Sequence, residues 1–530
     1  MNKSRRSFLK AFTLGAPALA LSPWANPLRS APRPNILFIM SDDHARQALS
    51  AYGSPYIRTP NIDRIGREGV RFASAFVTNS ICAPSRATIL TGKYSHINGL
   101  RDNQDQFNPN QFTFPEALHR AGYQTFFIGK WHLKTDPVGF DYWKILPGQG
   151  QYYHPDFRSP AGAERVTGYV TDRVTDFAIQ ALEQRERNRP FLMLLHHKAP
   201  HRNWMPPLKY LPAFLQKEYP LPENFFDDYA TRCKAAREAD MRVAGLYLSF
   251  DMKLKKHDYL TETGTGGRST FDAEKAWEAV YARFTPEERK IWDGFFDAVG
   301  ERFRKENPQG KELAVWKYQR YLQDYLACVA SLDENIGRIL DYLDQTGLAE
   351  NTMVIYTSDQ GFFLGEHGWY DKRFMYEESL GMPLMIRHPA TIPPGQMRHE
   401  LVLNLDFAPT ILDYCGVPIP ADLQGRSLRP LLEGHRPPDW RKETYYHYYE
   451  YPHGWHRVRR HFGIRTERFK LIHFYGKDID CWELYDLHSD PREMNNLYER
   501  KAYREMVQEL KARLRNLQRK VGDKEAMKLW

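Results

Sequence analysis

From Pro34 onward, short β-rich apolar runs alternate with amphipathic helical stretches, and this alternation constrains the fold more than any other feature of the sequence. Such a pattern is typical of a sheet covered by helices. Strands are predicted at Asn35–Met40, Tyr123–Ile128, Phe191–His196, Met353–Thr357 and Leu384–Ile386. Helices are predicted at Val166–Glu183 and Tyr321–Leu343, where apolar residues recur on one face. The core is therefore expected to be α/β.

Two segments depart from this alternation. Between residues 215 and 310 the strand signal is absent and charged helical sequence replaces it, which predicts a helical insertion beside the sheet. After a Pro-containing stretch near Gly434–Trp440, β-rich runs precede a predicted helix at Tyr503–Leu517. These runs are Glu443–Tyr451, Phe462–Phe474 and Trp482–Leu487. We therefore expect a main domain at 31–435 and a C-terminal α+β subdomain at 436–530, built from a small antiparallel sheet and one helix.

Residues 1–30 have the features of a twin-arginine export signal. Arg5 and Arg6 stand before Ser7-Phe8-Leu9-Lys10, and the apolar run Ala11–Ser22 that follows holds no acidic residue. No other segment approaches the roughly 18 apolar residues that a membrane span needs. We expect residues 1–30 to engage the export machinery, the mature protein to be periplasmic, and no stable membrane span.

The composition argues against two kinds of function, nucleic-acid binding and a structural zinc site. The chain has a formal net charge of +9, and residues 1–30 hold five basic and no acidic side chains, which leaves +4 for the rest. No Lys/Arg-dense helix accompanies this weak basic excess, so a nucleic-acid partner is not expected. The five cysteines are scattered without a Cys-x-x-Cys or Cys/His zinc spacing, so a structural zinc is not expected either.

Reactive residues lie just beyond the carboxyl ends of four predicted strands, where open α/β sheets place their ligands. They are Asp42 and Asp43, Lys130 and His132, His201, and Asp359 and Gln360. Singly, an Asp after a strand is more often a helix N-cap and a lone His is more often structural. Four such coincidences favour one shared site.

The acidic and amide residues of this set predict a metal site. Asp42, Asp43, Asp359 and Gln360 offer carboxylate and amide oxygens but no sulfur or imidazole, which favours a hard cation over zinc. Ca²⁺ is expected. Mg²⁺ is the competitor, disfavoured because it usually retains several waters.

One segment carries a resemblance to a known family. Cys82-Ala83-Pro84-Ser85-Arg86 continues through Ala87-Thr88-Ile89-Leu90 to Thr91-Gly92-Lys93. This resembles the signature of the type I sulfatases, of the alkaline phosphatase-like superfamily, whose cysteine is oxidised after translation to formylglycine by a sulfatase-maturing enzyme. The alternative is a buried structural cysteine. The resemblance implies a large mixed sheet sandwiched between helices, with a smaller C-terminal antiparallel sheet plus helix.

The chemistry explains why such a modification is useful. A thiolate nucleophile would give a stable sulfur-linked adduct, whereas a hydrated aldehyde carries two hydroxyls on one carbon. One hydroxyl attacks the sulfur, and the other allows the sulfated intermediate to collapse to aldehyde and sulfate. The resemblance implies that Arg86 and the metal favour the ionised form of that diol.

The resemblance also implies roles for the other residues. Asp42, Asp43, Asp359 and Gln360, with an oxygen of modified Cys82, look like the metal ligands, although Gln360 departs from the more frequent asparagine. Lys130 and Lys372 look like the lysines that bind the sulfate oxygens. Because Arg373 is the next residue, the match of Lys372 to the family position is uncertain by one residue. His201 resembles the histidine that protonates the leaving sugar oxygen, and His132 the one that assists collapse of the sulfated diol.

Two stretches rich in aromatic, imidazole and guanidinium groups suit a sugar substrate. They are His201–Trp204 and Tyr445–His461, and the candidate sugar-binding residues in them are Arg202, Trp204, His453, His456 and His461. The alternative is that the Tyr-rich run is simply an aromatic strand. With Asp371–Glu378, these stretches are most similar to bacterial N-acetylglucosamine-6-sulfatases acting on host glycans. Exo-acting 6-O-desulfation of N-acetylglucosamine or glucosamine in glycosaminoglycans or mucin glycans is therefore expected.

Other functions fit the same residues. An iduronate-2-, aryl or choline sulfatase is one alternative, because specificity in this fold resides in loops. A phosphonate or phosphodiester hydrolase of the same superfamily is another. A third is a non-catalytic protein that binds sulfated glycans through Lys130, His201, Arg202 and Lys372.

Overall fold

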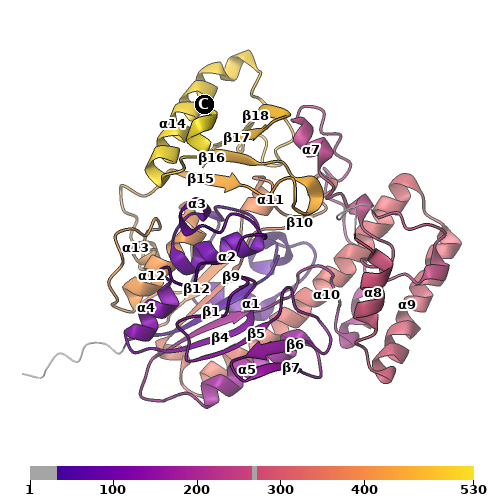
Figure 1. Cartoon of the computed structure of the whole chain (residues 1–530), viewed down its shortest axis with the longest axis horizontal. Helices are drawn as coiled ribbons and strands as arrows, with labels where there is room; N and C mark the ends of the chain where they lie inside the picture. The colour runs from indigo at the N-terminus through magenta and orange to yellow at the C-terminus, as the bar shows by residue number, and fades with distance from the viewer. Residues whose placement is uncertain (1–32, 265–270) are drawn as a thin grey trace, which may run out of the picture. The chain divides into compact units, whose positions relative to one another are not determined.

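A ten-stranded mixed sheet forms the centre of the molecule (Figure 1). The computed structural model describes residues 33–264 and 271–530. Across the sheet the strands are β13 (Gln396–Arg398), β2 (Val70–Phe72), β12 (Leu384–Arg387), β9 (Thr352–Ser358), β1 (Asn35–Ser41), β8 (Phe191–His196), β4 (Gln124–Lys130), β5 (Tyr142–Leu146), β6 (Asp156–Ser159) and β7 (Gly162–Arg165). All five strands predicted from the sequence are present.

The four middle strands, β9, β1, β8 and β4, run parallel to one another. They are almost wholly buried, as expected for parallel strands with helices on both faces. β12 pairs antiparallel with β9, which makes the sheet mixed. Because the middle strands are parallel, their carboxyl ends meet at one edge.

Helices cover both faces, as the resemblance implied. Residues of β1 alternate between two cores: Ile36 and Phe38 face one, and Leu37 and Ile39 face the other. The first core contains α2 (Cys82–Thr91), α4 (Phe114–Arg120) and α12 (Phe407–Tyr414). The second contains α1 (Pro60–Arg67), α5 (Val170–Glu183) and α10 (Gly310–Gln345). The predicted helix at Val166 begins four residues later, and the one at Tyr321 is the second part of the longer α10.

The segment predicted as a helical insertion lies between β8 and β9 in the chain. It contains α7 (Lys234–Glu238), α8 (Ala273–Tyr281) and α9 (Pro286–Glu306), and the short α6 (Leu211–Phe214) precedes it. Trp292 stacks on Phe296 at 4.2 Å between ring centroids, and both belong to the core that contains α10. Thr285 and Glu288 form a capping box at the start of α9. The insertion is thus built around its own aromatic residues.

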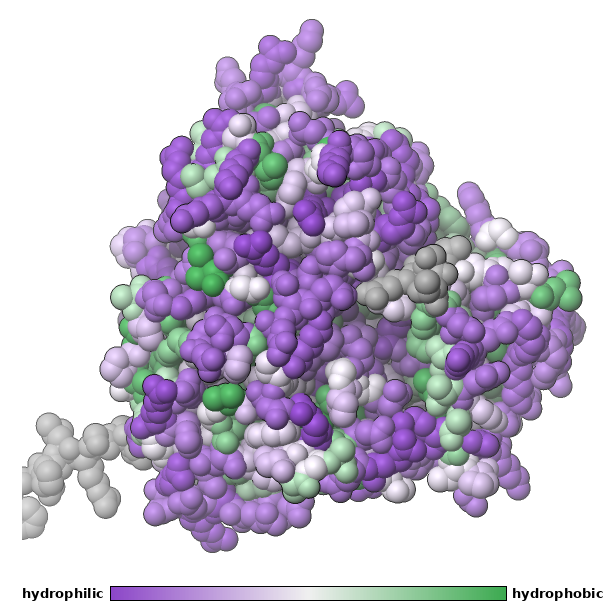
Figure 2. All heavy atoms as spheres, viewed as in Figure 1, coloured by the Kyte–Doolittle hydropathy of each residue, from purple (hydrophilic) through white to green (hydrophobic). Residues whose placement is uncertain are grey.

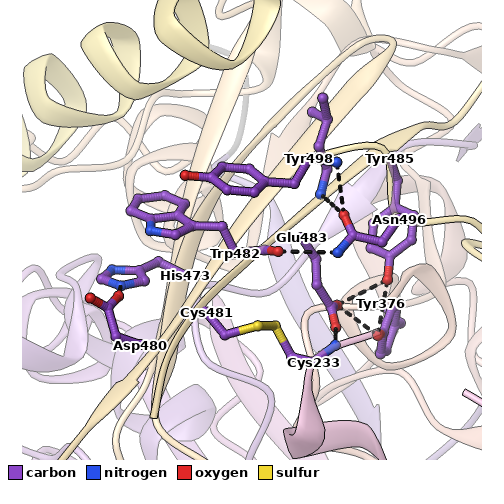
Figure 3. Close-up of a disulfide and its surroundings, with 11 residues drawn as sticks. Cys233, Tyr376, His473, Asp480, Cys481, Trp482, Glu483, Tyr485, Asn496 and Tyr498 are labelled. Atoms are coloured by element: carbon purple, nitrogen blue, oxygen red, sulfur yellow. Dashed lines mark hydrogen bonds and ion pairs between the residues drawn. A yellow bond between two sulfur atoms is a disulfide. The ribbon is translucent and has the colours of Figure 1, made fainter. Parts of the chain in front are cut away.

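A second, four-stranded antiparallel sheet follows near the C-terminus. Its strands are β15 (Glu443–Tyr448), β16 (His461–Thr466), β17 (Phe469–Gly476) and β18 (Ile479–Asp486), and α14 (Arg504–Val521) packs on it. The predicted β-rich run Phe462–Phe474 is a hairpin of β16 and β17. Cys481 on β18 forms a disulfide with Cys233, which directly precedes α7 (Figure 3). The insertion and the C-terminal sheet are therefore covalently joined.

The remaining short elements connect these parts. They are α3 (Ser95–Asn98), α11 (Glu377–Leu380), α13 (Arg429–Leu432), and the two-stranded pairs β3 (Ala75–Phe76) with β14 (Val402–Leu403) and β10 (Phe363–Leu364) with β11 (Tyr370–Asp371). β11 matters for the site, because Lys372 follows it.

The face seen in Figure 2 is mostly hydrophilic, with hydrophobic residues scattered in small groups. None of the helices in the described part of the chain combines the length and the apolar character that crossing a bilayer requires. The predicted export signal at 1–30 lies outside the described residues.

Candidate active site

The parallel strands bring the sequence-predicted reactive residues to one edge of the central sheet. Ser41 at the end of β1 is in register with Ser358 at the end of β9, so the pairs that follow them start side by side. These pairs are Asp42 with Asp43, and Asp359 with Gln360. Lys130 ends β4, and His201 follows β8 after a short turn.

Three buried carboxylates form the centre of this edge. Asp42, Asp43 and Asp359 offer oxygen atoms that all lie within 4.8 Å of one another, and each residue is at most 1% exposed. Gln360 donates from Nε2 to Asp43 Oδ1 at 2.5 Å, while its buried Oε1 has no hydrogen-bond partner among the residues that the structure describes. The donor set is thus hard oxygen with a spare amide oxygen, which fits a divalent cation such as Ca²⁺.

The electrostatics of the three carboxylates also fit a cation. Burial opposes ionisation of Asp42, but the charges of Lys130, His201 and Arg86 outweigh it and hold the pKa of Asp42 well below its ordinary value. Burial, together with the negative charge of Asp42, raises the pKa of Asp43 to about 6 and that of Asp359 to about 7. A cation between these carboxylates favours their ionised forms.

Cys82 is the first residue of α2 and points at this cluster. Its Sγ lies 3.6 Å from Asp42 Oδ1 and 4.0 Å from Gln360 Nε2. Burial raises the pKa of its thiol to about 12. The start of a helix carries a partial positive charge, which suits an anionic group at position 82.

Arg86, one turn along α2, holds the edge together. Its Nε and Nη2 donate to Asp359 Oδ2 at 3.1 and 3.0 Å, and its Nη1 donates to the Lys130 carbonyl at 2.6 Å. The side chain is 1% exposed. Arg86 therefore acts by fixing Asp359 and the end of β4, and by supplying positive charge.

The lysines occupy different depths. Lys130 Nζ bonds to Asp42 and is wholly buried beneath the edge. Lys372 Nζ donates to both oxygens of Asp43, at 2.6 and 2.7 Å. Arg373 turns the other way and donates to Glu450 at 2.7 Å. Of the two neighbours, Lys372 is thus the residue at the carboxylates.

Two histidines flank Cys82 and the carboxylates. His201 Nδ1 donates to the Arg202 carbonyl at 2.5 Å, and its Nε2 lies 3.7 Å from Asp43 Oδ2. His132 is held with a positive φ of 60°, and its Nε2 lies 3.1 Å from Gln149 Nε2. Burial and the charge of Lys130 lower the pKa of both imidazoles.

Part of this cluster lines a cavity of about 650 Å³. We call the lining made by Asp43, Cys82, His132, His201 and Lys372 the floor. One side, which we call the wall, is apolar and is made by Phe250, Phe271, Val280 and Trp455. Phe271 lies 5.2 Å from Phe250 and 5.3 Å from Trp455 between ring centroids. The insertion and the loop after β15 thus meet to form the wall.

The predicted sugar-binding residues divide into two groups. Arg202 and His456 line the cavity. Trp204 does not, because it is wholly buried against Tyr321 at 4.5 Å. His461 faces inward from β16 and accepts a hydrogen bond from the Met375 N–H, and His453 is an exposed partner of Asp102. The structure thus corrects the placement of Trp204, His453 and His461.

Several cavity residues were not singled out from the sequence. Asp371 Oδ2 lies 2.5 Å from His456 Nε2, and Glu450 holds Arg373 at the cavity. Lys198 is 3% exposed and lines the cavity, and burial with the nearby Lys130 charge lowers its pKa to about 7. Its place three residues before His201 is the one sequence signal that would have pointed to it.

Comparison with known proteins agrees with this geometry. The profile of the sulfatase family matches residues 34–417, and that of the C-terminal part of N-sulphoglucosamine sulphohydrolase matches residues 365–520. An N-acetylglucosamine-6-O-sulfatase of Bacteroides thetaiotaomicron is 50% identical over 513 residues, which cover 96% of this chain and 90% of that protein. The human N-acetylglucosamine-6-sulfatase is 28% identical over 78% of this chain and 67% of its own length.

Solved structures extend the likeness. One, a protein in complex with its substrate D-glucosamine-2-N,6-O-disulfate, has a TM-score of 0.88 and 50% identity, over 93% of this chain and 99% of that one. The phosphonate monoester hydrolase of Agrobacterium radiobacter has a TM-score of 0.66 and 22% identity over 92% of this chain and 96% of its own, which shows a shared fold alone. The family profile spans most of the chain, and the conclusion is direct: this chain belongs to the sulfatase family of sulfuric ester hydrolases.

Proposed function

We propose that the protein removes the 6-O-sulfate from terminal N-acetylglucosamine or glucosamine units of glycosaminoglycans or mucin glycans. The observation that carries this proposal is that Cys82, Asp43 and His201 meet on the floor of one cavity that also has an apolar wall, with Asp42 and Asp359 next to them. The 50% identical relative named for this activity supports the sugar and the position of the sulfate. The neighbour bound to a 6-O-sulfated glucosamine supports them as well.

The proposal includes two groups that the family implies, Ca²⁺ and formylglycine at position 82. Asp42, Asp43, Asp359 and Gln360 would hold the cation. The cation supplies positive charge beside position 82 and the sulfate, and the hydrated aldehyde supplies the attacking hydroxyl. A sulfatase-maturing enzyme would oxidise Cys82, which requires that the segment be reached before α2 is buried.

The remaining chemistry belongs to side chains of this chain. Lys372 lines the cavity and would bind sulfate oxygens directly, while Lys130 adds positive charge from beneath Asp42. His201 would give the proton on Nε2 to the departing sugar oxygen, and His132 would assist release of sulfate. The bound sulfate ester carries negative charge next to His201, which raises the pKa of this imidazole and favours its protonated form.

The body of the sugar would lie between the wall and the polar residues opposite. Phe250 and Trp455 offer flat apolar faces to the C–H groups of a pyranose. The Asp371, Arg373 and His456 side chains offer charged hydrogen-bond partners for hydroxyl groups. A cavity with an apolar side and a charged side suits a sugar better than a simple aryl ester.

We propose periplasmic localisation on the basis of the twin-arginine pattern at residues 1–30. Twin-arginine export moves folded proteins, so oxidation of Cys82 would precede transport. Mass spectrometry of the exported protein should then show the mass of formylglycine at position 82. An active exported protein with only the unmodified thiol would contradict this route.

The substrate proposal is tested with a panel of 2-O-, 3-O-, 4-O- and 6-O-sulfated monosaccharides, with released sulfate as the readout. Release from 6-O-sulfated glucosamines alone is the expected result, and preferred release from another position would contradict it. A phosphonate diester with an aryl group serves as the comparison substrate. Faster turnover of that diester than of the matching aryl sulfate would overturn the sulfate assignment.

A further inference from the structure

A buried ion pair links the insertion to the turn that carries His201. Arg202 donates to Asp251 twice, from Nε to Oδ1 at 2.8 Å and from Nη2 to Oδ2 at 2.7 Å. Asp251 is wholly buried, and the side chain of Arg202 is 12% exposed. A bidentate pair of this kind fixes both distance and orientation. The pair therefore fixes where the turn after β8 lies relative to the insertion.

Asp251 is itself held in place by the insertion. Its Oδ2 accepts the Tyr247 N–H at 2.8 Å, and its own N–H donates to the Tyr247 carbonyl at 3.1 Å. Lys253, two residues on, is anchored to Asp324 of α10 at 2.6 Å. These contacts hold the Asp251 carboxylate in a fixed position.

The same turn determines how His201 is presented. Its Nδ1 donates to the Arg202 carbonyl at 2.5 Å, and its own carbonyl accepts the Tyr152 hydroxyl at 2.7 Å. The proton on Nδ1 is used in this bond, so Nε2 is the nitrogen that faces the floor, 3.7 Å from Asp43 Oδ2. A shift of the Arg202 backbone would therefore also shift His201 Nε2.

We propose that Asp251 is a positioning residue for His201, so that the insertion determines the geometry of proton transfer to the leaving group. The inference rests on the proposed role of His201. In that step an oxygen at position 82 bonds to the sulfur as the bond between sulfur and the sugar oxygen breaks, and the proton on Nε2 moves to the sugar oxygen to give the neutral alcohol. His201 then regains a proton from water.

The nature of the leaving group provides a test that fold stability does not influence. A sugar alkoxide is a poor leaving group and needs the proton, whereas an aryl oxide with electron-withdrawing groups leaves without it. In Asp251→Asn, kcat for a 6-O-sulfated glucosamine should fall about 10- to 100-fold, because a displacement near 1 Å is enough for such a loss. KM should stay within about twofold, and kcat for 4-nitrophenyl sulfate should fall less than about threefold.

The matched control is Asp227→Asn. Asp227 is a buried partner of Arg232 within the insertion, so its loss removes a buried ion pair from the insertion while Asp251 and Lys253 keep their partners. It should lower the thermal unfolding temperature without a difference between the two substrates. If Asp251→Asn fails to fold, Arg202→Lys keeps the charge but loses the bidentate geometry and should give the same substrate difference.

His201→Ala separates this inference from the proposed function. It should lose activity on the sugar sulfate far more than on the aryl sulfate; equal losses would remove the assigned role of His201. If His201→Ala shows the difference but folded Asp251→Asn and Arg202→Lys do not, the positioning role is overturned and the role of His201 stands.

Discussion

The floor and the wall of the cavity differ in how they are built. The floor consists of polar side chains that follow strands or begin α2, and buried ion pairs support it: Lys372 with Asp43, Arg86 with Asp359, and Lys130 with Asp42. The wall is neutral and comes from segments far apart in the chain, at Phe250, Phe271, Val280 and Trp455. Its parts are held by contacts outside the central sheet.

This difference separates the chemistry from the choice of substrate. In the proposed function, the floor residues other than His201 act on the sulfate, which every sulfate ester has, so their loss should affect all substrates alike. Groups on the wall can touch only what is attached to the sulfate. Changes to the wall should therefore alter KM for a sugar and leave an aryl sulfate almost unaffected.

Loss of the nucleophile is the largest predicted effect. Cys82→Ala should reduce release of sulfate from sugar and aryl substrates alike by at least about 10⁴-fold, because no other group on the floor can form the covalent intermediate. Released sulfate is measured together with the thermal unfolding temperature. Cys415→Ala is the control, since Cys415 is also buried but lies away from the cavity, and it should keep its activity. Residual turnover by Cys82→Ala on either substrate would contradict the assignment.

Removal of the metal should come next. A strong chelator should reduce activity on both substrates more than about 100-fold and lower the unfolding temperature, because Asp42, Asp43 and Asp359 then face one another without a cation. At a concentration of 100 to 1,000 times Kd, added Ca²⁺ should restore about 3–4 kcal/mol of stability. Calorimetry with Ca²⁺ and with Mg²⁺ distinguishes the two ions. Unchanged stability after chelation would contradict a metal at this cluster.

The way in which the floor and the wall are built determines how much of each could be predicted from the sequence. Strands such as Asn35–Met40 were found almost to the residue because burial on both faces requires a continuous apolar run. The acidic cluster beside the floor followed from the strands, since parallel strands place Asp42 and Asp359 at one edge. Cys82 and Lys372, which line the floor, were found through the family resemblance of the sequence around them.

The wall and its supports could not be found in this way. Phe271 and Trp455 touch although 184 positions separate them, and nothing in either local sequence indicates the contact. The face of the strand on which a side chain lies was also not predicted. His461 points into the core, whereas the run of His and Tyr residues suggested a sugar-binding surface. Which pairs form over long separations is decided by tertiary packing.

Substitutions in the wall should give a smaller and more selective effect. Phe250→Ala or Trp455→Ala should raise KM for a 6-O-sulfated N-acetylglucosamine about 5- to 10-fold, which corresponds to about 1–1.4 kcal/mol of stacking. The kcat value and the turnover of 4-nitrophenyl sulfate should stay within about twofold. Phe226→Ala, an exposed aromatic residue of the insertion outside the cavity, is the control. Equal losses on both substrates would show that the wall also shapes the floor.

The disulfide between Cys233 and Cys481 should have the smallest effect on catalysis. It joins the insertion to β18 (Figure 3). The segment after Cys233 leads to Asp240, whose N–H donates to the His456 carbonyl at 2.7 Å beside the cavity. Glu483 also accepts the Cys233 N–H at 2.8 Å, so this segment keeps a second attachment when the disulfide is removed. Cys233→Ser with Cys481→Ser should therefore cost about 2–4 kcal/mol of unfolding free energy while KM for the sugar rises only about twofold.

The double variant is compared with the disulfide-bonded wild type by denaturant unfolding and by kinetics on both substrates. Loss of stability with nearly normal kinetics is the expected result, because the disulfide mainly restricts the unfolded chain. A tenfold or larger rise in sugar KM at temperatures where the variant is folded would contradict this expectation. It would mean that the wall depends on the covalent link, and that the C-terminal sheet takes part in selecting the sugar through more than the Trp455 and His456 contacts.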